Sequence, residues 1–135
     1  MRELRLEEAR VDRLGDVLAF VDGILEALDC PMKAQMKIDV AVEELFANIA
    51  HYAYAPETGP AVLRVAVEPD RTVAITFVDQ GVPFDPLARP DPDVTLAAED
   101  RLIGGLGIYM AKKTMDGMEY RREGDSNVLT IRKRI

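Results

Sequence analysis

The chain has 135 residues, of which 48% are hydrophobic and 30% charged, as is typical of a soluble globular protein. Its net charge of −7 argues against binding to bare nucleic acid, which requires a basic surface. No apolar run approaches the roughly 20 residues of a membrane span, and M-R-E-L-R-L-E-E at the start lacks the apolar core of a signal peptide. Because Cys30 is the single cysteine, no intramolecular disulfide can form, and we expect a cytoplasmic protein.

The first half of the chain predicts an edge strand followed by two amphipathic helices. Residues 2–6 alternate polar and apolar side chains, which favours a short strand at the edge of a sheet. Apolar residues three and four positions apart predict helices over residues 11–28 and 32–53. We expect Asp12 to cap the first helix and Pro31 to separate the two.

Two hairpins are predicted in the second half. Residues 61–68 and 72–79 are apolar strands with a short link, which favours antiparallel pairing. Residues 118–123 and 127–134 form a second such pair around E-G-D-S. We therefore expect the sheet to be mostly antiparallel.

A long connection and a short helix lie between the hairpins. Prolines forbid a regular element in the first part of residues 80–103, and connections of this length are usually functional or mobile. Residues 108–115 predict a helix. The order of elements predicts an α+β fold with a single domain over residues 1–135. It would be a two-layer α/β sandwich with helices on one face of the sheet.

The first motif is E-E-L-F-A-N, residues 43–48, on the second predicted helix. Glu44 and Asn48 are four residues apart, so their side chains share one stripe of the helix and can face one site. An asparagine inside a helix is mildly unfavourable because its amide competes for backbone hydrogen bonds. The alternative is a solvated polar stripe opposite the core.

The second motif is V-D-Q-G-V-P-F-D-P, residues 78–86. Asp79 ends an apolar strand, where its carboxylate can accept a hydrogen bond from an amino group in a pocket. Gly81 lets the chain turn away with no side chain in the path. An ordinary turn at the end of a strand is the alternative interpretation.

The third motif is G-G-L-G-I-Y-M, residues 104–110, directly before the predicted short helix. Free backbone N–H groups at a helix N-terminus bind anions, and glycines let phosphates approach them. No Gly-Lys-Ser/Thr follows, and no strand leads directly into the motif, so it matches neither a Walker loop nor a dinucleotide fingerprint. A glycine-rich turn is the alternative.

Taken in order, the three motifs resemble the N, G1 and G2 boxes of the Bergerat-fold ATPases, which include gyrase, histidine kinases and mismatch-repair ATPases. Within that superfamily the chain is similar to the small anti-sigma-factor serine/threonine kinases, over nearly its whole length. The resemblance implies the histidine-kinase-like ATPase fold, with ATP and Mg²⁺ as cofactors.

The resemblance also implies roles for the residues of the first two boxes. Glu44 matches the general base, and Asn48 matches the Mg²⁺ ligand. Asp79 matches the aspartate that receives the adenine amino group, and Gly81 supports the adenine pocket. Phe84 falls in the family's D-x-G-x-x-F-D-P pattern, at the start of the ATP lid.

For the third box, the resemblance places a glycine-rich stretch near the phosphates: Gly104, Gly105, Leu106 and Gly107. The lid would cover roughly residues 86–104. Within it, Arg101 would meet the γ-phosphate or remain a solvated charge.

The sequence departs from the family pattern at one position. Several members carry histidine four residues after the N-box asparagine, where this chain has Tyr52. We therefore assign His51 no catalytic part, and expect Tyr52 and Tyr54 to serve packing.

For partners, the resemblance implies a serine on a STAS-domain anti-sigma-factor antagonist as substrate. It also implies a sigma factor that is sequestered, and a homodimer, with no direct contact to nucleic acid or membrane. Two other hypotheses remain open at this point. One is an ATP-gated protein-binding module without physiologically relevant kinase turnover, and the other is an interaction domain that binds no nucleotide.

Overall fold

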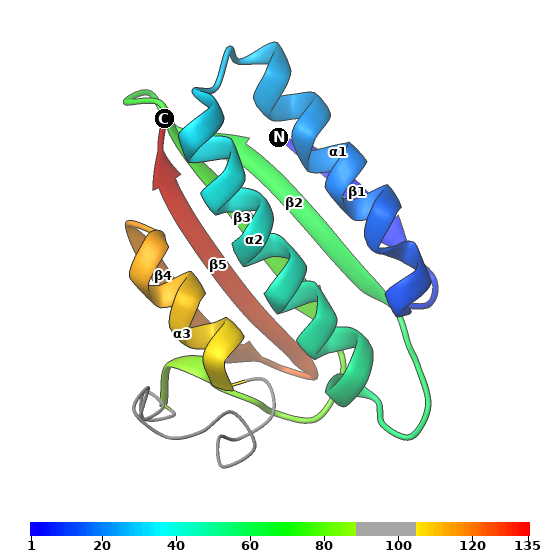
Figure 1. Ribbon diagram of the computed structural model, residues 1–135. Helices are drawn as coiled ribbons and strands as arrows, with labels where there is room; N and C mark the ends of the chain where they lie inside the picture. The colour runs from blue at the N-terminus through cyan, green and yellow to red at the C-terminus, as the bar shows by residue number, and fades with distance from the viewer. Residues whose placement is uncertain (89–104) are drawn as a thin grey trace.

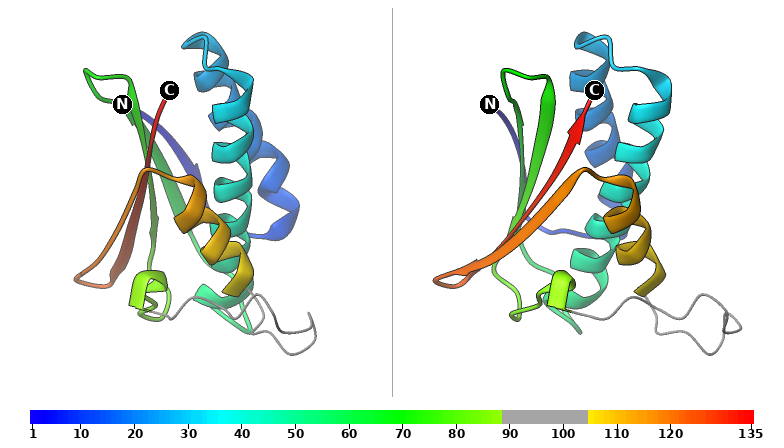
Figure 2. Two further views of the ribbon diagram at one scale, coloured as in Figure 1. Left: turned by 60° about the vertical axis from the view of Figure 1, so that its left-hand side comes forward. Right: turned by 90° about the vertical axis from the view of Figure 1, so that its left-hand side faces the viewer.

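The computed structural model describes residues 1–88 and 105–135, and it confirms the predicted α+β fold. A five-stranded sheet has the strand order β1-β2-β3-β5-β4, and every neighbouring pair is antiparallel. Helices α1, α2 and α3 all lie on one face of it, as Figures 1 and 2 show. The strands are β1 (Arg2–Leu6), β2 (Ala61–Val67), β3 (Thr72–Asp79), β4 (Gly117–Glu123) and β5 (Ser126–Arg134). The helices are α1 (Leu14–Ala27), α2 (Met32–Asn48) and α3 (Gly105–Thr114).

The core lies between the sheet and the helices and follows from the alternation of the strands. In β3 every second side chain is buried, and Val73, Ile75 and Phe77 point toward the helices. On α2, Ile38 and Phe46 belong to the buried stripe that packs against them. The next position in the alternation of β3 is Asp79, so the fold itself turns this carboxylate toward the helices.

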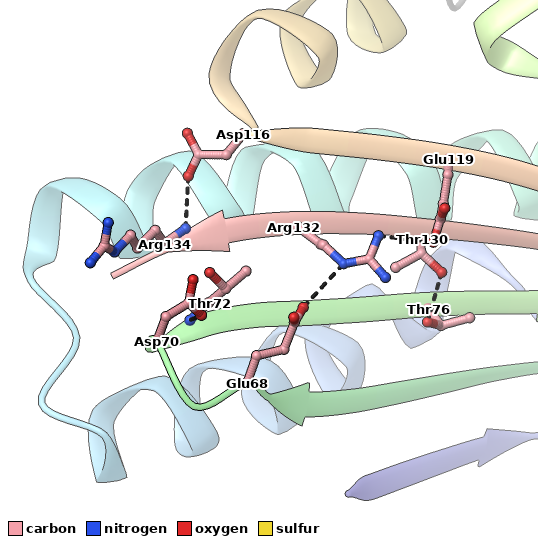
Figure 3. Close-up of polar contacts among 9 residues, drawn as sticks. All are labelled: Glu68, Asp70, Thr72, Thr76, Asp116, Glu119, Thr130, Arg132 and Arg134. Carbon is pink, nitrogen blue, oxygen red and sulfur yellow. Dashed lines mark hydrogen bonds and ion pairs between the residues drawn. The ribbon is translucent and has the colours of Figure 1, made fainter.

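The opposite face of the sheet, which we call the open face, is polar (Figure 3). The hydroxyls of Thr76 and Thr130 lie 2.9 Å apart across β3 and β5. Arg132 donates to Glu68 at 3.1 Å and to Glu119 at 2.8 Å. Exposed ion pairs of this kind contribute little stability each, so the fold depends mainly on the core.

Three local features differ from the sequence-based expectations. Asp12 does not cap α1, because a 3₁₀ turn (Val11–Arg13) precedes the helix and the Asp12 carboxylate accepts from Arg10 Nε at 3.3 Å. The second predicted helix, residues 32–53, is α-helical only to Asn48, and its last turn is a wider π turn at Ile49–Ala53. Helix α3 begins at Gly105 rather than at residue 108, so two of the motif glycines form its first turn.

Within the two described segments, no helix combines the length and the apolar character needed to cross a membrane.

Candidate functional site

The residues predicted from the first two motifs meet at one end of the sheet. There the C-terminal end of α2, the first turn of α3 and the ends of β3 and β5 come together, at the lower end of Figure 1. A cavity of about 80 Å³ lies at this end, with room for several water molecules at roughly 10–15 Å³ each. Phe77 and Leu129 give it apolar walls, and Asn48, Asp79 and Asn127 add polar groups. Such a lining is typical of small-ligand sites.

Asp79 is held in the cavity wall by two hydrogen bonds to one of its carboxylate oxygens. The residue is only 5% exposed, and its Oδ1 accepts from the Gly81 N–H at 2.8 Å and from Asn127 Nδ2 at 2.9 Å. Within residues 1–88 and 105–135, no side chain or backbone N–H donates to the other oxygen, Oδ2. Both donors act on one oxygen, so Oδ2 is the atom with which the carboxylate can accept a hydrogen bond from a ligand.

The loop after β3 packs directly on the π turn, and this contact requires Gly81. A Cβ at that position would lie 2.3 Å from the carbonyl oxygen of Ala53 and 2.6 Å from its carbonyl carbon. The same carbonyl accepts the Val82 N–H at 3.0 Å. Turns of π type inside helices are frequent at functional sites, and here the widened turn supplies one wall of the cavity.

Tyr54 ties this loop to the segment before β2, as expected for a packing residue. Its hydroxyl accepts the Gln80 N–H at 2.7 Å and donates to the carbonyl of Pro60 at 2.6 Å. Burial raises the pKa of the Tyr54 phenol. Tyr52, in contrast, is 47% exposed and lines the cavity, with its ring 5.9 Å from that of His51.

Glu44 lies against the first turn of α3. A Cβ on Gly107 would fall 2.2 Å from Glu44 Oε2 and 2.8 Å from its Cδ, so the two elements touch at this point. One helical turn further along α2, Asn48 lines the cavity. The structure thus brings the acid and the amide of the first motif to the junction with the third.

The remaining predicted residues are placed as follows. Phe84 is 40% exposed and lines the cavity. Gly105 and Leu106 belong to the first turn of α3, whereas Arg101 and Gly104 lie outside the described residues.

The sequence-based prediction missed Asn127 and Tyr120. Asn127 is 6% exposed and contacts Asp79, and the Tyr120 hydroxyl donates to Asn127 Oδ1. The sequence does contain an indication of this role. Asn127, Leu129 and Ile131 are alternate residues of β5 and lie on its core-facing side, so Asn127 is a polar residue in an otherwise apolar series. A polar residue at an apolar position of such a strand indicates a specific buried contact.

Comparison with known proteins agrees with this geometry. Residues 8–133 match the model of the histidine kinase-like ATPase domain. The chain belongs to this family. A curated relative, the serine/threonine-protein kinase BtrW of Bordetella bronchiseptica, is 23% identical over 99 residues, which cover 73% of this chain and 70% of that protein.

Two solved structures share the fold of this histidine kinase-like ATPase domain. The RsbU and RsbW domains of Rv1364c from Mycobacterium tuberculosis match with a TM-score of 0.67, 15% identity and 99% of this chain covered. This chain spans only 32% of that chain's length. The SiaB–SiaC complex from Pseudomonas aeruginosa matches with a TM-score of 0.61 and 15% identity, over 96% of this chain and 88% of that one.

Proposed function

We propose that this chain is a single-domain, cytoplasmic, ATP-binding anti-sigma regulatory serine/threonine kinase. It phosphorylates a serine of a STAS-domain anti-sigma-factor antagonist and sequesters a sigma factor. One observation carries the proposal: Asn48 and Asp79, from two separate motifs, line the same cavity. Glu44, one helical turn before Asn48, contacts Gly107 of the third motif. The family match and the kinase name of the relative from Bordetella support it.

The chemistry of the cavity lining supports an adenine base as its ligand. Asp79 can accept a hydrogen bond from the exocyclic amine of adenine, whereas guanine presents a carbonyl at that position and would be repelled. The Phe77 and Leu129 side chains offer apolar surface to the ring. Gly81, through its contact with Ala53, holds the turn that keeps Asp79 at this point.

The donor set beside the cavity also fits a phosphate chain with Mg²⁺. No group of three or more His, Cys, Asp or Glu side chains in the described part of the chain could hold a metal ion. Mg²⁺ often keeps several waters and binds through phosphate oxygens, so the side-chain oxygen of Asn48 would be its ligand from the protein. The backbone N–H groups at the start of α3, around Gly105 and Gly107, would hold phosphate oxygens.

Glu44 is the proposed general base. When bound, Mg-ATP supplies the transferable phosphoryl group and the charge neutralisation that its transfer needs. The Glu44 carboxylate would accept the proton of the substrate serine hydroxyl, a role typically worth about 10²–10⁴ in rate. Its contact with Gly107 keeps this carboxylate beside the start of α3.

The test is phosphoryl transfer from labelled ATP to the STAS protein encoded nearest to this chain's gene. We expect Glu44→Gln to lower the transfer rate by about 100-fold or more while leaving Mg-ATP affinity nearly unchanged. The matched control is Glu43→Gln, which alters the exposed neighbouring carboxylate and should transfer phosphate at the wild-type rate. Absence of transfer to any STAS protein would contradict the kinase assignment.

A binding module gated by ATP would give a different pattern. In that case the Glu44→Gln variant would keep partner binding and signalling intact, whereas Asp79→Asn would abolish both. The sigma factor and the homodimer are tested separately, by co-purification with candidate sigma factors and by light scattering of the purified chain.

A further inference from the structure

Asn127 uses its whole side-chain amide to connect three parts of the site. Its Nδ2 donates to Asp79 Oδ1 and to the carbonyl of Val82, both at 2.9 Å. Its Oδ1 accepts from the backbone N–H of Phe84 at 3.3 Å and from the hydroxyl of Tyr120. Two donors and two acceptor positions are thus all engaged, which is the full capacity of an asparagine.

Two backbone groups fix which way this amide points. The N–H of Phe84 can only donate, and the carbonyl of Val82 can only accept. A rotation of the amide by 180° would place its oxygen against the carbonyl oxygen of Val82 and its N–H₂ group against the N–H of Phe84. Both hydrogen bonds would then be lost. Asn127 therefore has to present an N–H, and never its oxygen, to the Asp79 carboxylate.

This orientation determines what Asp79 offers to the cavity. Oδ1 already receives the N–H groups of Gly81 and Asn127, so it is held in place as an acceptor. Oδ2 is then fixed in direction by the same two bonds. A carboxylate held in this way attracts an amino group and repels a carbonyl oxygen.

We propose that Asn127 is a positioning residue that makes the cavity select a purine carrying a 6-amino group over its 6-oxo counterpart. This inference rests on the proposed nucleotide-binding function and names the residue that sets its base specificity. Tyr120 assists through its hydroxyl. Because Phe84 still orients the amide when that hydroxyl is lost, Tyr120 contributes less than Asn127.

The decisive experiment measures the dissociation constants of Mg-ATP and Mg-ITP by calorimetry, because ITP carries a 6-oxo group in place of the amine. Asn127→Asp keeps the shape of the side chain but replaces the donating N–H₂ with an acceptor that faces Asp79. We expect the preference for ATP over ITP to fall by about tenfold or more in Asn127→Asp. Tyr120→Phe, which removes one hydroxyl, should lower the same preference by about twofold to fivefold.

Thr130→Val is the matched control. It removes a side-chain hydrogen bond between the same strands, β3 and β5, but on the open face (Figure 3). The preference for ATP should stay within about twofold of the wild type in this variant. If Asn127→Asp fails to fold, judged by circular dichroism, Tyr120→Phe decides the question.

An unchanged preference for ATP over ITP in the folded variants, whether or not both affinities fall, would show that Asn127 does not set base specificity. It would overturn the inference, while the proposed function would stand. A wild-type chain that binds neither nucleotide would overturn both.

Discussion

Glu44 and Gly107 are in such close contact that any side chain on the glycine would collide with the glutamate. A Cβ there would lie 2.2 Å from Glu44 Oε2 and 3.1 Å from Glu44 Cβ. Gly107, in the first turn of α3, therefore leaves the space that the Glu44 carboxylate occupies. The candidate base and the candidate phosphate-binding turn are coupled through this contact.

Substitution of Gly107 tests this coupling. We expect Gly107→Ala to push the Glu44 carboxylate aside and to lower phosphoryl transfer by about tenfold or more. Because alanine favours a helix and the displaced oxygens end a flexible side chain, the free energy of unfolding should change by only about 1 kcal/mol. Transfer kinetics and urea denaturation of the same samples provide the two measurements.

Gly23→Ala is the control for this variant. Gly23 lies inside α1, and a Cβ there would meet nothing within 4 Å. The substitution should raise the free energy of unfolding by about 0.5–1 kcal/mol and leave transfer unchanged. Wild-type transfer by Gly107→Ala would show that the contact does not position Glu44.

At Gly81 an added methyl group meets backbone, which cannot swing aside. The Ala53 carbonyl oxygen would lie 2.3 Å from the new Cβ. We expect Gly81→Ala to lower the free energy of unfolding by about 1–3 kcal/mol, because the loop must shift away from the π turn. Mg-ATP affinity should fall as well, since the Gly81 N–H holds Asp79 Oδ1. Gly15→Ala is the control, because a Cβ there would meet nothing within 4 Å. Wild-type stability of Gly81→Ala would contradict the close contact between Gly81 and Ala53.

Stability should also depend on pH through Asp39, which faces α1 from α2. Its Oδ1 is buried without a hydrogen-bond partner among the described residues, and Asp22 and Glu26 of α1 and Glu43 of α2 surround it with negative charge. Burial, then the hydrogen bond with Asp22 and these charges, raises the pKa of Asp39 to about 7. The folded state therefore holds a proton that the unfolded chain releases near pH 4.

The direction in which stability changes with pH follows from this difference in pKa. The folded state binds the extra proton between about pH 4 and pH 7, so its stability falls as the pH rises through that window. After allowance for solvent screening, the loss is about 1–2 kcal/mol. We expect Asp39→Asn to remove this loss, and therefore to be more stable than the wild type at pH 8 but not at pH 4. Urea denaturation of both proteins at pH 4 and pH 8 measures the difference in their free energies of unfolding. An identical pH dependence in the variant would contradict the role of Asp39.

The regular elements could be predicted from the sequence because their signals are local. The alternation in residues 72–79 and the spacing of apolar residues in 11–28 reflect burial on one face, and both elements formed where expected. The capping role of Asp12 was wrong, because a 3₁₀ turn and an arginine pairing replaced it. The start of α3 was placed too late, because glycine disfavours a helix and the contact of Gly107 with Glu44 has no local signal in the sequence.

The candidate site was predictable only in part. Glu44, Asn48 and Asp79 stand in recognisable motifs, whereas the role of Asn127 arises from the pairing of β5 with β3. That register places Asn127 directly opposite Asp79, although 48 residues separate them in the chain. Such a long-range contact has no local signature beyond one polar residue in an apolar alternation.

The most direct test of the central claim is calorimetric titration of Mg-ATP into the wild-type chain and into the Asp79→Asn variant. Asparagine can keep its oxygen on the N–H groups of Gly81 and Asn127, and then turns a donor instead of an acceptor toward the base. We predict binding of one Mg-ATP per chain in the wild type and affinity weaker by about 100-fold or more in the variant. No binding by the wild type, or equal affinity in the two proteins, would contradict the account.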